Sequence, residues 1–161
     1  MLIKLTVINA SPLIVLFKSQ QADLLPQLFS EILVPAGVWD EVTATQNDMA
    51  SQQLPAVSWV QRVEIGGIAP EVLAWDLGKG ESEVLSWAKK NTNYAAVVDD
   101  RAARRCAKSF GILTIRTGRL LILSKQRGLI DSVSERLQWL RDAGLYLSDN
   151  VVNLLKQQVG E

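Results

Sequence analysis

The stretch LIKLTVINASP, residues 2–12, decides the expected fold, because an apolar segment ends there in polar residues and a helix start. Residues 2–8 are mostly apolar and β-branched, which predicts a buried strand. Ser11 is a natural N-cap and Pro12 a natural first helical residue, so a short helix is expected over residues 12–18. A buried strand that leads directly into a helix is typical of a parallel sheet covered by helices.

The same alternation of strands and helices continues to the end of the chain. Further strands are expected over residues 31–34, 58–65, 95–98 and 112–115, and helices over 22–29, 36–42, 81–90, 101–110, 117–127, 131–143 and 148–158. The polar residues 43–57 indicate a loop or irregular helix, and Gly66, Gly67 and Pro70 mark another loop. With no linker and no internal repeat, the pattern predicts a single α/β domain over residues 1–161, with a parallel sheet covered on both sides.

The composition excludes several kinds of catalytic site. The chain has 161 residues, no histidine and one cysteine. It therefore lacks a Ser-His-Asp or Cys-His pair, a His-ligated zinc site and an internal disulfide. Any catalysis must rest on carboxylates, hydroxyls, Lys or Arg side chains, or a bound cation.

The N-terminal residues do not form the pattern of a secretion signal. Lys4, Asn9 and the Ser11-Pro12 pair interrupt the apolar residues before any small-residue cleavage site. No segment reaches the roughly 18 apolar residues needed to cross a bilayer. We therefore expect a cytoplasmic protein with no membrane partner.

The charges are balanced over the whole chain but separated along it. Residues 22–88 contain ten acidic and two basic residues, and residues 101–130 contain eight basic and no acidic residues. Such a separation suits a cation site next to a surface that binds a polyanion. The alternative interpretation is that both stretches form solvated helix faces.

Side chains able to bind a cation follow two of the expected strands. Asn9 ends the first strand, and Asp99 and Asp100 end the strand of residues 95–98. In open α/β sheets, ligands bind outside the carboxyl ends of the strands. Adjacent residues on a strand face opposite sides, so one aspartate of the pair is expected in the site while the other caps the next helix.

Three glutamates could join the same site. Glu81 and Glu83 begin one expected helix, and Glu41 lies late in another. Carboxylates that share a cleft need a cation between them, and Mg²⁺ and Mn²⁺ favour oxygen ligands. The alternative interpretation is that these acids are ordinary first-turn, capping or solvated side chains.

Six blocks of sequence, in order along the chain, resemble PIN domains, the fold of VapC-type toxin ribonucleases. The match is closer still to a PIN-like bacterial family of unknown function. The blocks are VINASPLI (7–14), LVPAGVWDEV (33–42), LGKGESE (77–83), VVDDRAAR (97–104), RGLI (127–130) and AGLYLSD (143–149). The resemblance implies a three-layer α/β/α fold with a mostly parallel central sheet, and hydrolysis of RNA that depends on Mg²⁺ or Mn²⁺. It also implies a toxin component with a small antitoxin partner, and a homodimer.

The resemblance also assigns roles to individual residues. By position, Asn9, Glu41, Glu83 and Asp100 match the four catalytic and metal-binding acids, with Glu81 and Asp99 as alternates within their doublets. Ser11 matches a small hydroxyl residue next to the site. The basic segment is expected to hold the RNA backbone through Arg101, Arg104, Arg105, Lys108, Arg116 and Arg119.

One departure from the family pattern is Asn9, which stands where the family has Asp. Its carbonyl oxygen can still ligate a cation, but it carries no charge and cannot act as a base. Metal affinity should therefore be lower than with Asp. The alternative function is a catalytically inactive PIN-like module that binds RNA or a protein partner.

Overall fold

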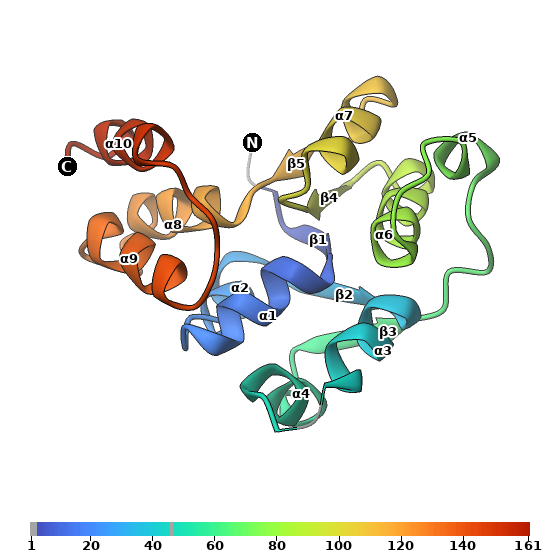
Figure 1. Cartoon of the computed structure of the whole chain (residues 1–161), viewed down its shortest axis with the longest axis horizontal. Coiled ribbons are helices and arrows are strands. Elements are labelled where there is room, and N and C mark those ends of the chain that lie inside the picture. Colours follow the sequence, from blue (N-terminus) through green and yellow to red (C-terminus); the bar gives the residue numbers. More distant parts are fainter. Residues whose placement is uncertain (1–2, 46) are drawn as a thin grey trace.

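The computed structural model describes residues 3–45 and 47–161 (Figure 1). Within them, five strands form one sheet in the order β3-β2-β1-β4-β5, and every neighbouring pair is parallel. The strands are β1 (Leu5–Ile8), β2 (Glu31–Pro35), β3 (Val60–Val63), β4 (Tyr94–Val97) and β5 (Thr114–Ile115).

Helices connect the strands and close the chain. The first half contains α1 (Ala10–Lys18), α2 (Leu24–Leu28), α3 (Ala36–Ala44), α4 (Met49–Gln53), a 3₁₀ turn (Leu54–Ala56) and α5 (Pro70–Leu73). The second half contains α6 (Lys79–Lys90), α7 (Arg101–Ser109), α8 (Thr117–Gln126), α9 (Val133–Asp142) and α10 (Asp149–Gln158). In the described residues, every helix is too short or too polar to cross a membrane.

The strand order reverses direction at β1. The chain moves outward from β1 through β2 to β3, then returns to β4 on the other side of β1 and continues to β5. Since parallel crossovers are right-handed, the two directions place their helices on opposite faces of the sheet. Figure 1 agrees, because α1, α3 and α4 gather on one side and α5, α6 and α7 on the other. The predicted three-layer α/β/α fold is confirmed, and the carboxyl ends of β1 and β4 meet at its switch point.

The central strands are buried on both faces. Val7 and Ile8 of β1, Val34 of β2 and Ala96 of β4 have no exposed surface. The one fully buried polar side chain of these three strands, Thr6, donates its hydroxyl proton to the carbonyl of Ala95 at 2.9 Å. Uninterrupted apolar strands are expected where helices cover both sides of a parallel sheet.

Several helix boundaries differ from the sequence prediction, and α2 and α9, for example, each begin two residues later than expected. Helix α1 begins at Ala10 with Asn9 at the N-cap position, so Ser11 lies within the first turn and is not the cap. Pro12 is tolerated there because the N–H groups of a first turn have no partner inside the helix. Helix α6 begins at Lys79, two residues early, and Pro70 starts the short helix α5 where a loop was expected.

The C-terminal helix is attached to α8 and α9 by one carboxylate. Glu161 accepts hydrogen bonds from the backbone N–H groups of Val133 and Ser134 at 2.8 and 3.0 Å, and from the Lys125 ammonium at 2.6 Å. The bonds from Lys125 and Ser134 hold the pKa of Glu161 well below its usual range. This contact fixes α10 beside α8, and α10 forms one wall of a cavity there.

Candidate functional site

Asn9 leaves β1 at the switch point with its side chain free of the helix that it begins. It is 4% exposed, and its backbone N–H donates to the carbonyl of Val97 on β4 at 3.1 Å. An asparagine at this position usually accepts a hydrogen bond from the first turn, but Asn9 makes no such side-chain bond. Its carboxamide instead points toward the N-terminus of α6.

The side chains of Asn9 and Glu41, from two different elements, converge on Gly80 of α6. A Cβ atom placed on Gly80 would lie 3.0 Å from Oδ1 of Asn9 and 3.8 Å from Oε1 of Glu41. Glu41 projects from α3, and Glu81 lies one residue after Gly80 in α6, with its carboxylate next to Gly78. We call Asn9, Glu41 and Glu81 the Gly80 cluster. Because Gly80 has no side chain, Oδ1 of Asn9 and Oε1 of Glu41 can lie close to its backbone.

The electrostatics of the Gly80 cluster are those of crowded carboxylates. Partial burial raises the pKa of Glu41, and the nearby charge of Glu81 raises it further. A like charge nearby disfavours the ionised form of Glu41. A bound cation would remove that repulsion.

Glu83, which the family resemblance placed among the catalytic acids, lies one turn further along α6 and contacts α3. It is 6% exposed, and its Oε1 accepts the backbone N–H of Gly37 at 3.1 Å. Gly37 must lack a side chain, because a Cβ there would overlap the Glu83 carboxylate. The other oxygen, Oε2, is buried with no hydrogen-bond partner among the described residues. Glu83 thus satisfies the N-terminus of α3, which begins after a proline that cannot cap it.

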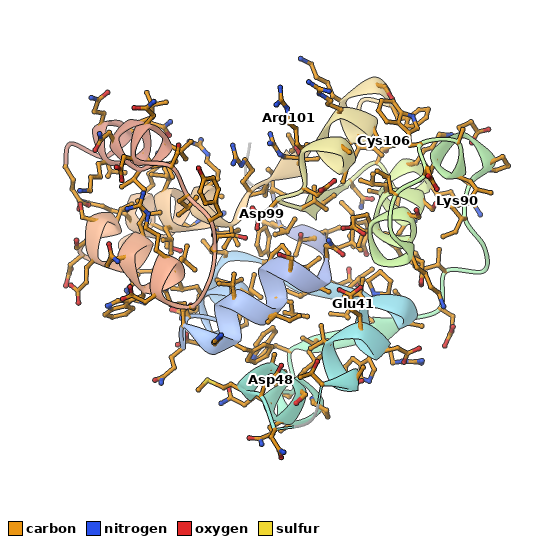
Figure 2. The ribbon with its side chains drawn as sticks, in the orientation of Figure 1. Glu41, Asp48, Lys90, Asp99, Arg101 and Cys106 are labelled. Atoms are coloured by element: carbon orange, nitrogen blue, oxygen red, sulfur yellow. The ribbon has the colours of Figure 1, made fainter. Side chains whose placement is uncertain are left out.

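Asp99 follows β4 and holds the N-terminus of α8. Its two carboxylate oxygens accept the backbone N–H of Thr117 at 2.9 Å and the Thr117 hydroxyl at 2.6 Å. Figure 2 shows Asp99 on the α8 side of the switch point and Glu41 on the α3 side. Both oxygens of Asp99 therefore have strong hydrogen bonds without a cation.

Asp100 is the N-cap of α7. Its Oδ2 accepts the backbone N–H of Ala103 at 2.9 Å, and its side chain is exposed. This is the capping role that the sequence analysis gave to one member of the aspartate pair. Asp99 performs the equivalent role for α8.

The predicted RNA-binding residues divide into two groups. Arg101, Arg105 and Lys108 are exposed on α7, and Ser11 is exposed on α1. Arg104, Arg116 and Arg119 instead line a cavity next to Asp99. Burial lowers the pKa of Arg104, and the neighbouring charge of Arg116 lowers it further. The second group is therefore a concentrated positive charge near the switch point.

The donor set of the Gly80 cluster fits one hard divalent cation. Among the described residues, no three His, Cys, Asp or Glu side chains are placed to hold a metal. The cluster offers two carboxylates and one amide oxygen. Mg²⁺ is commonly held by one or two carboxylates together with waters and substrate phosphate. The approach of Asn9 and Glu41 to Gly80, and the uncommitted side chain of Asn9, agree with such a ligand.

Two partners in these contacts were not singled out from the sequence. The hydroxyl of Thr117 donates to Asp99, and the backbone N–H of Gly37 donates to Glu83. In each pair the two residues are distant in the sequence. Nothing in the local sequence marks Thr117. Gly37 and Gly80 do lie within the blocks LVPAGVWDEV and LGKGESE, so the glycines of those blocks were an available signal.

Comparison with known proteins extends over nearly the whole chain. Residues 5–161 match a protein family described as a PIN domain. No curated protein matches the chain.

Proposed function

The chain belongs to the PIN domain family, and from this premise we propose that it is a metal-dependent ribonuclease. The cation is Mg²⁺ or Mn²⁺, held by Asn9, Glu41 and Glu81. The observation that carries the proposal is the convergence of Asn9 and Glu41 on Gly80. Glu83, Asp99 and Asp100 act as positioning residues, because their oxygens bond to the helix starts that carry the site.

Each group has a separate task in this proposal. The bound cation supplies an activated water and stabilises the charge that grows on the phosphate. Glu41 and Glu81 provide the negative charge that holds the cation, and Asn9 provides a neutral oxygen from the buried end of β1. The basic residues of α7 and α8 hold the RNA backbone through its phosphates.

The test is cleavage of a quenched fluorescent RNA by the whole chain, with Mn²⁺ or with chelator. Cleavage should require Mn²⁺ and should fall at least roughly a hundredfold in Glu41→Gln, because a metal ligand is lost. Asp40→Asn is the matched control, since it removes the same charge from the adjacent exposed residue of α3. Cleavage by Glu41→Gln at the wild-type rate would contradict the proposal.

A second candidate function is a PIN-like module that binds without cutting. Two observations favour it: Asn9 is uncharged where the family has Asp, and both oxygens of Asp99 are already bonded to Thr117. Metal-independent RNA binding with no cleavage, in protein free of any partner, would support this function. Recovery of cleavage in Asn9→Asp would then assign the loss to that one side chain.

Family membership also leads to proposals about partners and compartment. We propose a toxin of a toxin–antitoxin pair, with a small antitoxin protein as partner, a homodimeric assembly and a cytoplasmic location. A small protein encoded next to this chain, which copurifies with it and suppresses RNA cleavage, would support the toxin assignment. Light scattering on the purified chain gives the oligomeric state, and a monomer at micromolar concentration would refute the dimer.

A further inference from the structure

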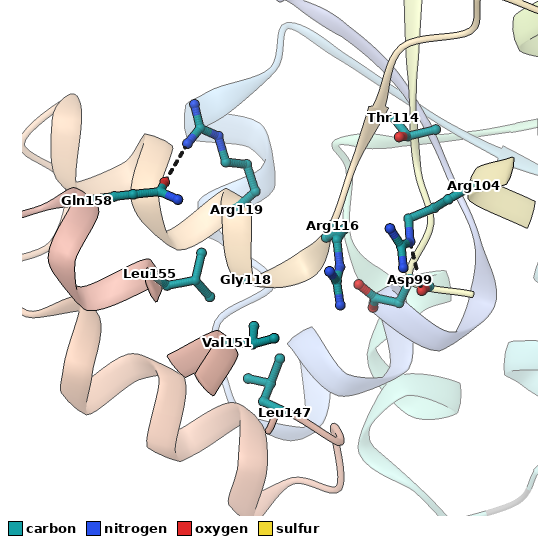
Figure 3. Close-up of a pocket in the computed structure, with 10 residues that line it drawn as sticks. All are labelled: Asp99, Arg104, Thr114, Arg116, Gly118, Arg119, Leu147, Val151, Leu155 and Gln158. Atoms are coloured by element: carbon teal, nitrogen blue, oxygen red, sulfur yellow. Dashed lines mark hydrogen bonds between the residues drawn. The ribbon is translucent and has the colours of Figure 1, made fainter. Parts of the chain in front are cut away.

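A cavity of about 310 Å³ lies between α8 and α10, beside Asp99 (Figure 3). Two of its sides differ in chemistry. One side carries Arg104 and Arg116, and the other carries Leu147, Val151 and Leu155. Arg119 lies on the side of α10, where it donates to Oε1 of Gln158 at 2.8 Å. A cavity of this size is at the lower end of the range for small-molecule sites.

The arginines of the cavity have no carboxylate partner. Among the described residues, no ion pair includes Arg104, Arg116 or Arg119. Asp99 is close, but its oxygens bond to Thr117. Arg104 uses its Nε–H on the carbonyl of Asp99 at 3.3 Å. Figure 3 shows the Arg116 guanidinium beside these two residues. The charges of Asp99 and Asp100 offset only part of the repulsion on Arg104, so the cavity keeps an excess of positive charge. Such an excess favours a phosphate, which accepts several charge-assisted hydrogen bonds.

The opposite wall of the cavity is apolar and closely packed. Leu155 of α10 lies against α8, because a Cβ on Gly118 would come 2.9 Å from its Cδ1. Val151 lies one helical turn before Leu155 and lines the same cavity. A free phosphate gains nothing from an apolar wall, whereas the flat face of a nucleobase does. Phosphate-binding and base-binding surfaces therefore face one another.

We propose that this cavity binds one nucleotide of the RNA strand, with its phosphate on the arginines and its base against α10. The inference rests on the proposed function for its substrate class, and it adds a defined subsite formed by the C-terminal helix. The subsite lies at the end of β4, the neighbour of the strand that ends at Asn9. A nucleotide held there would fix the strand next to the Gly80 cluster.

The first experiment measures binding of small ligands to the whole chain by calorimetry, in the presence of chelator. The probes are uridine monophosphate, adenosine monophosphate, uridine and inorganic phosphate. Both nucleotides should bind at least about tenfold more tightly than uridine or phosphate, because only they use both walls. Phosphate that binds as tightly as the nucleotides, or no binding of nucleotides at millimolar concentration, would overturn the proposal.

Variants separate the two walls of the cavity. Arg116→Ala should weaken the binding of nucleotide and of phosphate about tenfold, whereas Leu155→Gln should weaken nucleotide binding alone. Val151→Gln repeats the test of the apolar wall at a partly exposed position, in case Leu155→Gln unfolds the protein. Equal effects of wall and arginine variants on phosphate would contradict the division of roles.

Two matched controls test whether the effects are specific to the cavity. Arg62→Ala removes the same charge from β3, at the opposite edge of the sheet. Leu154→Gln makes the same change at the neighbouring residue of α10, which is 59% exposed and does not line the cavity. Both should bind nucleotide like the wild type. A loss equal to that of the cavity variants would refute the subsite.

The outcome is distinguishable from that of the RNA cleavage assay. Nucleotide binding in chelator does not need the Gly80 cluster. RNA cleavage without nucleotide binding would refute the subsite alone. Nucleotide binding without RNA cleavage would refute the nuclease and retain the subsite.

Discussion

The Gly80 cluster and the Asp99–Asp100 pair lie at the same edge of one sheet but use their oxygens differently. Asp99 and Asp100 each bond to the N-terminus of a helix, through Thr117 and Ala103. In the cluster, the Asn9 side chain accepts no hydrogen bond from the first turn of α1. Partial burial and the charge of Glu81 raise the pKa of Glu41. The comparison teaches that acid residues at a switch point divide into those that hold helices and those left free for a ligand.

The largest expected effect comes from adding the missing charge to the Gly80 cluster. In Asn9→Asp, a carboxylate replaces the carboxamide at the buried end of β1. At an effective dielectric near 20, a unit charge at ~4 Å interacts with another by roughly 4 kcal/mol, and desolvation of the new carboxylate offsets part of this. Mn²⁺ affinity measured by calorimetry should rise by about ten- to a hundredfold. Unchanged affinity would show that Asn9 does not face the cation.

The second effect concerns stability at the aspartate pair. Asp99→Ala leaves the N–H and hydroxyl of Thr117 without their acceptors, which should lower the free energy of unfolding by about 1–3 kcal/mol. Asp100→Ala removes only a helix cap and should cost about 1 kcal/mol. Urea unfolding in chelator measures both. If Asp99→Ala weakened Mn²⁺ binding with no loss of stability, the assignment of Asp99 to a positioning role would be wrong.

The third prediction concerns Glu161, which lies outside the Gly80 cluster and makes the free energy of unfolding depend on pH. The folded-state pKa of Glu161 is lowered by its bonds to Lys125 and Ser134, so ionised Glu161 stabilises the fold. That stability is present above the unfolded pKa, near 4.5, and is lost as the pH falls through the lower folded value. Glu161→Gln should lose about 1 kcal/mol at pH 7 and nothing at the lowest pH of the titration. An equal loss at both ends would contradict the ionic contribution.

The smallest expected effect has the opposite sign. The folded pKa of Glu41 is raised, so its contribution favours folding at low pH and is lost as the pH rises through the folded value. At pH 7 without metal, Glu41→Gln should therefore raise the free energy of unfolding, by on the order of 0.5 kcal/mol because Glu41 is screened by solvent. Urea unfolding in chelator tests this, with Asp40→Asn as control. Destabilisation by Glu41→Gln would place Glu41 among the structural acids.

The fold could be predicted from the sequence because its strands carry their own signals. The β1 and β4 segments are short, apolar and end in polar residues, and helices separate them. Helix boundaries were less accurate at α1, where Asn9 and Ser11 are both good N-caps. The structure places Asn9 at the boundary because the chain leaves β1 there, hydrogen-bonded to Val97.

The sequence names candidate residues for the site, but it does not contain the division between them that their hydrogen bonds show. Glu81 and Glu83 look alike in sequence, and so do Asp99 and Asp100. Their hydrogen-bond partners lie far away in the sequence. The backbone N–H of Gly37 donates to Glu83, 46 residues later in the chain, and the backbone N–H of Thr117 donates to Asp99, 18 residues earlier. Such pairings depend on tertiary packing, which local sequence patterns do not contain.

The central claim is that the Gly80 cluster, and not the Asp99–Asp100 pair, holds the cation. Titration of Mn²⁺ followed by the electron paramagnetic resonance signal of the free ion tests it directly. We expect Glu41→Gln to weaken Mn²⁺ binding at least about tenfold, while Asp40→Asn and Asp99→Ala stay within about twofold of the wild type. Loss of binding in Asp99→Ala with wild-type binding in Glu41→Gln would contradict it.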